Sequence, residues 1–183
     1  MAKSQYIFDQ LSYLTPDTHE KVSQLIAYLH GKGIATHIAA TFRTPETQAM
    51  LYSKSQDSVK EGHAPATYTD QSFHEVGRAV DLDVIPMTSA AGRASGNEFD
   101  NVKIMLDAWE QLGGVDMRRW WGKKSHFGNT IGQWYDWHHL EYRNGRTWAE
   151  AKEEYDALGK APVQDINIGQ VVWGTVGGYA AYR

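Results

Sequence analysis

The stretch Ser72-Phe73-His74-Glu75-Val76-Gly77-Arg78-Ala79-Val80-Asp81-Leu82-Asp83 decides how this sequence folds. Its second half alternates apolar and charged residues, which predicts a half-buried strand over Ala79–Ile85 with Asp81 on the polar face. His74 precedes the strand by a short turn. Because an extended chain would separate His74 from Asp81 by roughly 23 Å, the two side chains can meet only if the chain folds back at Gly77.

A histidine and a carboxylate that meet in this way are two ligands of the type that binds zinc. The segment Asp136-Trp137-His138-His139-Leu140-Glu141 can supply a third. A catalytic zinc typically has three protein ligands and keeps a water in its fourth position. A carboxylate three residues before a ligand histidine can act on that water as a general base. The residue types therefore favour a metal centre with an open position.

Three motifs follow one another along the chain. An Arg stands in the context Thr-Phe-Arg-Thr-Pro-Glu-x-Gln, then comes His-x6-Asp with a Ser two residues before the His, and last Asp-x-x-His-x-Glu. From about Phe42 to Tyr142 this combination resembles the M15 family of zinc peptidases. That family contains D-alanyl-D-alanine carboxypeptidases and dipeptidases, and L-alanyl-D-glutamate endopeptidases that include bacteriophage endolysins. The resemblance implies a zinc metallopeptidase that hydrolyses the stem peptide of peptidoglycan.

The resemblance also implies a role for each matching residue. The implied Zn²⁺ ligands are His74, Asp81 and His139. Asp136 matches the general base, and Arg43 matches the Arg that stabilises charge on the carbonyl oxygen of the substrate. Substrate-binding or supporting positions near the site are matched by Ser72, Gln48 and Glu141. Ser72 and Gln48 have an alternative role, because either side chain can simply cap or hydrogen-bond the backbone.

Two departures from the endolysin pattern concern the third ligand and the substrate pocket. His138 stands where many of these proteins have a proline, and it offers a competing imidazole. The spacing from Asp136 and the following x-Glu141 favour His139 as the ligand. A Trp-Gly-Gly-Asp-Trp stretch that is common in this branch is matched only in part by Trp120-Trp121-Gly122-Lys123-Lys124. These departures leave open which bond of the stem peptide is cleaved.

Three functions remain in play. The size and layout of the chain favour the endolysin branch, which predicts an L-alanyl-D-glutamate endopeptidase. The alternative within the family is a D-Ala-D-Ala carboxypeptidase or dipeptidase. The alternative outside it is a non-catalytic zinc-stabilised binding module, because the related hedgehog signalling domains keep a similar zinc site. Asp136 and Arg43 favour the enzyme, since a structural site needs neither a base nor an oxyanion partner.

Composition excludes several other classes of protein. The chain has 183 residues, no Cys and a net charge of −4. Disulfide frameworks and thiolate metal sites are therefore excluded, and charges of both signs are mixed along the chain without the basic stripe that nucleic acid requires. No apolar run reaches the roughly 18 residues of a membrane span, and the N-terminus lacks the apolar core of a secretory signal. We expect a monomer made in the host cytoplasm that reaches the wall after membrane permeabilisation.

The remaining pattern predicts the α+β class, with helices packed on a small antiparallel sheet as in the M15 peptidase and hedgehog-like fold. Helices are predicted to begin at Pro16, Pro45, Phe99 and Trp148, and strands to cover residues 34–42, 79–85 and 134–142. The polar stretch Ser53–Gln71 has neither period and predicts a long loop. Residues 1–159 are expected to form the peptidase domain, and residues 160–183 a hairpin packed on it.

Overall fold

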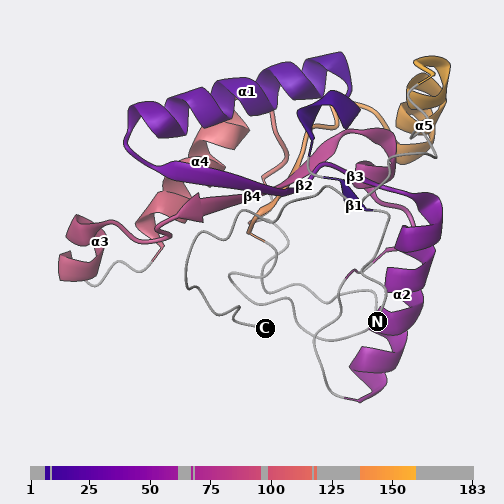
Figure 1. Cartoon of the computed structure of the whole chain (residues 1–183), viewed down its shortest axis with the longest axis horizontal. Coiled ribbons are helices and arrows are strands. Elements are labelled where there is room, and N and C mark those ends of the chain that lie inside the picture. The colour runs from indigo at the N-terminus through magenta and orange to yellow at the C-terminus, as the bar shows by residue number, and fades with distance from the viewer. Residues whose placement is uncertain are drawn as a thin grey trace, which may run out of the picture.

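The computed structural model describes residues 7–8, 10–61, 67, 69–95, 99–116, 118 and 137–159. Helices pack on a small antiparallel sheet, which confirms the α+β prediction (Figure 1). In chain order the elements are β1 (Ile7–Phe8), the 3₁₀ helix η1 (Leu11–Tyr13), α1 (Pro16–Gly31), β2 (Ala35–Ala40), β3 (Phe42–Arg43), α2 (Pro45–Lys60), the 3₁₀ helix η2 (Phe73–Val76), β4 (Ala79–Ile85), α3 (Ala90–Ser95), α4 (Asp100–Gln111), β5 (His139–Glu141) and α5 (Trp148–Ala157). The predicted hairpin over residues 160–183 lies outside the described residues.

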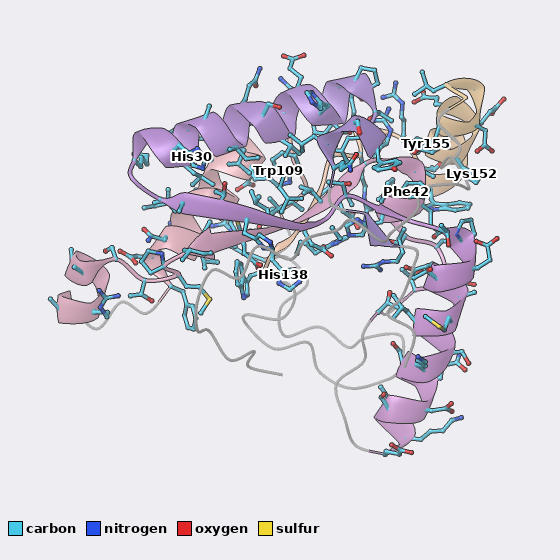
Figure 2. All side chains as sticks on the ribbon, viewed as in Figure 1. His30, Phe42, Trp109, His138, Lys152 and Tyr155 are labelled. Atoms are coloured by element: carbon cyan, nitrogen blue, oxygen red, sulfur yellow. The ribbon has the colours of Figure 1, made fainter. Side chains whose placement is uncertain are left out.

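The central sheet has the strand order β2-β4-β5, with both pairs antiparallel. One face of β4 carries fully or almost fully buried apolar residues: Val80, Leu82 and Val84. They pack against α1 and α4 in the main core, where Trp109 is the largest fully buried side chain (Figure 2). Because successive side chains of a strand point to opposite faces, Asp81 lies on the other face of the sheet. The alternation predicted from sequence thus separates the core from the polar face.

A second, smaller cluster joins α5 to the short strand β3. Phe42 stacks on Tyr155 with ring centroids 5.7 Å apart, and both side chains are buried (Figure 2). Helix α5 begins with a complete capping box, in which Thr147 accepts from the backbone of Glu150 and the Glu150 carboxylate accepts from the backbone of Thr147. The capping sequence predicted this helix correctly.

The sequence predicted a short helix followed by a long loop over Ser53–Gln71. This prediction is wrong in its first part, because α2 continues to Lys60. Its inward side chains are polar. Ser55 Oγ donates to the carbonyl of Leu51 at 2.7 Å and accepts from the backbone N–H of Thr67 at 3.0 Å. Since buried hydrogen bonds rather than an apolar stripe hold this part of the helix, hydrophobic periodicity could not reveal it.

The strand predicted over 134–142 is much shorter in the described part of the chain. Only His139–Glu141 pairs with β4, while Trp137 and His138 form a turn, and residues 134–136 lie outside the described residues. Helix α3 was not predicted, since its six residues show no apolar period. Among the described helices, none combines the length and the apolar character that crossing a membrane would need.

The turn before β4 depends on Gly77. Its φ of 62° is left-handed, and a Cβ there would lie 2.6 Å from the carbonyl oxygen of Tyr13 and 2.7 Å from Cε2 of Tyr155. The backbone is held on both sides, because Thr15 N–H donates to the carbonyl of Gly77 at 2.9 Å and Arg78 N–H donates to that of Phe73. The chain therefore reverses where the sequence predicted, in a space that only glycine fits.

Replacing Gly77 with Ala is expected to lower the free energy of unfolding by about 2–4 kcal/mol, because it adds left-handed strain to a clash with backbone. Urea denaturation followed by circular dichroism measures the change. Gly31→Ala is the matched control, since nothing lies within 4 Å of a Cβ there, and it is expected to leave stability unchanged or raise it. A Gly77→Ala protein as stable as the parent would contradict the role given to this turn.

Candidate metal centre

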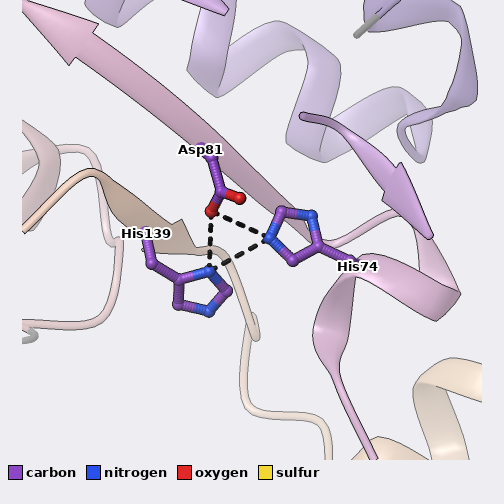
Figure 3. A group of neighbouring side chains, drawn as sticks. All are labelled: His74, Asp81 and His139. Carbon is purple, nitrogen blue, oxygen red and sulfur yellow. Dashed lines mark hydrogen bonds and ion pairs between the residues drawn. The ribbon is translucent and has the colours of Figure 1, made fainter. Parts of the chain in front are cut away.

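Three side chains from three different elements converge on one point (Figure 3). His74 Nε2 lies 3.0 Å from Asp81 Oδ1 and 3.1 Å from His139 Nδ1, and His139 Nδ1 lies 3.0 Å from the same Asp81 oxygen. His74 is fully buried, and the other two side chains are 12–13% exposed. The structure thus brings together the three residues that the resemblance implied as metal ligands.

Strand register and the Gly77 turn explain this convergence. Asp81 and His139 are directly paired across β4 and β5, so their side chains are neighbours on one face of the sheet. His74 reaches the same face because the left-handed Gly77 turns η2 back over the start of β4. The site is therefore built on the polar face, opposite the core beneath α1 and α4.

Ser72 fixes the start of η2 and so the position of His74. Its Oγ accepts from the backbone N–H of His74 at 3.3 Å, and its own N–H donates to Glu75 Oε2 at 2.6 Å, which completes a capping box. Trp148 Nε1 of α5 donates to the carbonyl of Ser72 at 3.0 Å. Within the described residues Ser72 acts as a helix cap, the alternative that the sequence left open.

Glu141 orients the imidazole of His139. Its Oε1 lies 3.0 Å from His139 Nε2. Burial raises the pKa of the Glu141 carboxyl, but the hydrogen bond with His139 and the charge of Arg143 outweigh it and bring the pKa to about 2. An ionised carboxylate only accepts, so Nε2 of His139 carries a proton and donates it. With Nε2 as the donor in a neutral ring, Nδ1 presents its lone pair to Asp81 and His74.

The donor set fits a divalent metal ion. Burial lowers the pKa of His74, which favours the neutral ring. Burial raises the pKa of Asp81, but a proton on the neighbouring His74 and His139 rings holds the pKa well below its usual range, so the carboxylate is ionised when positive charge lies beside it. Lone pairs of two imidazoles and a carboxylate that meet at 3.0–3.1 Å are best balanced by a cation between them. A tetrahedral zinc holds such ligands at about 2.0–2.1 Å, which separates them by roughly 3.4 Å.

Arg43 approaches the oxygen of Asp81 that the two histidines do not contact. Its Nη2 lies 3.6 Å from Asp81 Oδ2, an ion pair longer than a hydrogen bond. Its Nη1 donates to Gln48 Oε1 at 2.8 Å, and the buried Gln48 donates in turn to the carbonyl of Thr69 at 2.6 Å. Gln48 therefore fixes the guanidinium beside the centre. Nε of Arg43 has no hydrogen-bond partner among the described residues.

The sequence also singled out His138 as a competing imidazole and Asp136 as the general base. His138 is not part of the three-residue group that the described residues form, which leaves His139 as the imidazole at the centre. Asp136, the implied general base, lies outside the described residues. His139 rather than His138 is therefore the candidate ligand. The role of Asp136 stays a prediction.

Sequence analysis missed Arg143, which contacts the centre through Glu141. Its Nε donates to Glu141 Oε2 at 2.7 Å, and its Nη2 lies 2.6 Å from the same oxygen. The alternation His139, Glu141, Arg143 is a signal that could have revealed it, because residues two apart in an extended segment share a face.

A family model described as VanY, D-alanyl-D-alanine carboxypeptidase, matches residues 11–144. A vancomycin resistance D,D-pentapeptidase VanY variant from a VanB-type resistance cassette, in complex with Zn(II), is similar at 16% identity and a TM-score of 0.46, with 78% of each chain covered. VanYB in complex with D-alanine-D-alanine has 16% identity and a TM-score of 0.47, with 86% of each chain covered.

A third solved structure is the LdcB LD-carboxypeptidase, at 19% identity and a TM-score of 0.45. The match covers 79% of this chain and 64% of that one. None of the curated proteins matches the sequence.

Replacing His139 with Ala is expected to abolish binding of a divalent metal ion at micromolar concentrations, because it removes one of three converging ligands. His138→Ala is the matched control, one residue away, and is expected to bind the metal as the parent does. Isothermal titration of the metal-free proteins with zinc measures both affinities. The reverse result, with binding lost in His138→Ala and kept in His139→Ala, would show that the neighbouring imidazole is the ligand.

Proposed function

This chain belongs to the VanY family of D-alanyl-D-alanine carboxypeptidases, and from that premise we propose that its His74, Asp81 and His139 hold a catalytic zinc which acts on the terminal D-alanyl-D-alanine bond of the peptidoglycan stem. The observation that carries the proposal is the convergence of the three ligand atoms at 3.0–3.1 Å on the polar face of the sheet. Zinc is supported by the ligand types and by the Zn(II) held in the similar VanY structure.

The family assignment confirms the broader predictions. The chain is an M15-type zinc peptidase that acts on peptidoglycan, and it is an enzyme rather than a non-catalytic binding module. The residue roles and the bond cleaved are the parts that we propose.

The residues around the centre divide the work of hydrolysis. When bound, zinc would lower the pKa of a water toward ~7 and polarise the carbonyl that is attacked. Asp136, three residues before His139, takes a proton from the attacking water and later donates it to the leaving amine. Arg43, held by Gln48, keeps its guanidinium beside Asp81, where it can donate to the oxygen that becomes negative.

A second candidate bond is the L-alanyl-D-glutamate bond of the same stem. The motif Asp136-x-x-His139-x-Glu141 resembles the M15 family as a whole, which includes endopeptidases that cleave this bond, and the contact between Glu141 and His139 gives the last motif position a task. In that case the protein would be a bacteriophage endolysin that reaches the wall through a permeabilised membrane. The two candidates share the metal centre and differ only in how the stem is seated.

Incubation of the zinc-loaded protein with purified muropeptides that carry a full pentapeptide stem is expected to release terminal D-alanine alone. Mass spectrometry of the products identifies the bond. Release of the whole stem after L-alanine would establish the endopeptidase instead. If neither product forms, the proposed activity is wrong.

Asp136→Ala is expected to lower turnover of the cleaved muropeptide by 10²–10⁴-fold while zinc stays bound, because a general base contributes about that much and is not a ligand. The zinc content of the purified protein and the rate of product release measure the two effects separately. Asp57→Asn on the exposed end of α2 is the control and should change neither. A variant at position 136 with the parent's rate would exclude this residue as the base.

A further inference from the structure

We propose that Arg143 is a positioning residue of the metal centre, which acts through Glu141 to hold the His139 imidazole with Nδ1 toward the metal. The inference rests on the proposed function, because it concerns the same zinc site. It assigns to Arg143 a task that follows neither from the ligand motifs nor from the fold. It predicts that metal affinity is set partly by a guanidinium that does not touch the metal.

The two oxygens of the Glu141 carboxylate contact different side chains. Oε1 lies 3.0 Å from His139 Nε2, while Oε2 accepts from Arg143 Nε at 2.7 Å and lies 2.6 Å from its Nη2. Among the residues that the structure describes, each oxygen thus has one partner residue. With Oε2 held by the two nitrogens of a planar guanidinium, the carboxylate cannot rotate without breaking a charge-assisted pair. Oε1 is thereby aimed at His139.

The guanidinium of Arg143 is itself held by an aromatic ring. Its Cζ lies 4.7 Å from the centroid of the Phe73 ring, a cation–π contact. Phe73 is buried and directly precedes His74 in η2. The guanidinium therefore connects the segment that carries one ligand histidine with the segment that carries the other. The chain Phe73, Arg143, Glu141, His139 fixes the two ligand-bearing segments relative to each other.

Arg143 also balances the negative charge of the Glu141 carboxylate. The Glu141 side chain is 10% exposed, and a buried carboxylate is costly unless it is paired. Arg143 supplies the pairing charge from the solvent side, since its own side chain is 39% exposed. Without Arg143, the carboxylate would have solvent as its alternative partner and His139 would lose a fixed acceptor. A purely structural ion pair would affect stability alone, whereas a positioning role also affects metal affinity.

The test compares zinc affinity in Arg143→Gln, Arg143→Lys, Glu141→Gln and the double variant Glu141→Gln/Arg143→Gln. Zinc dissociation constants come from competition with a chromophoric chelator, and urea unfolding of the metal-free proteins reports stability separately. Arg146→Ala is the matched control, because Arg146 lies in the same loop and pairs with Glu154 rather than Glu141.

Glu141→Gln is expected to raise the dissociation constant by about 10–100-fold, as for other residues that orient metal ligands. Arg143→Gln is expected to raise it about tenfold, and Arg143→Lys less, because lysine keeps the charge but not the planar fork. The double variant should bind zinc no more weakly than Glu141→Gln alone, since Arg143 acts through that carboxylate. Arg146→Ala should bind like the parent.

An unchanged dissociation constant in Arg143→Gln overturns the inference, and so does an additive loss in the double variant. If Arg143→Gln does not fold, Arg143→Lys decides, and parental affinity there also overturns it. These readouts need no substrate. If the affinities change as expected but no muropeptide is cleaved, the proposed activity fails while the inference stands. If the parent cleaves muropeptides and Arg143 variants keep its affinity, only the inference fails.

Discussion

The left-handed turn at Gly77 is the constraint on which the rest of the site depends. Six residues lie between His74 and Asp81, and the two side chains meet at 3.0 Å only because the backbone reverses there. The reversal is secured by neighbours rather than by propensity, since the backbone of Thr15 and the ring of Tyr155 close around Gly77. Helices α1 and α5, which carry none of the three ligands, therefore contribute to the position of the first ligand.

The sheet separates two kinds of interaction. Its buried face is apolar and packs beneath α1 and α4, whereas its other face carries the ionisable groups that converge on the centre. On that face two of the three ligands are held by partners behind them: Asp81 by the Arg43–Gln48 pair, and His139 by the Glu141–Arg143 pair. Such outer contacts are what give a metal site its geometry before the metal arrives. Nδ1 of His74 has no hydrogen-bond partner among the described residues.

Much of this arrangement could be predicted from the sequence because its signals are local. The alternation in Ala79–Ile85, the turn at Gly77 and the capping box at Thr147 each act within a few residues, and all three are present in the structure. The second half of α2 could not be predicted, because Ser55 is held by Thr67 rather than by an apolar stripe. The contact of Arg143 with Phe73 depends on tertiary geometry, which spacing does not encode, whereas the helix cap made by Ser72 is a local contact that the sequence offered as an alternative.

The order of the three ligands along the chain has a consequence for biosynthesis. His74 and Asp81 leave the ribosome together, but His139 follows Asp81 by 58 residues. Before β5 pairs with β4, only two ligands are in place. A metal ion that also bound His139 at that stage would have to bring the two ends of the intervening segment together, at an entropic cost. Tight binding therefore waits for the last strand of the sheet to dock. The bound ion then stabilises only states in which β5 is paired with β4, so occupancy of the centre reports that the sheet is complete.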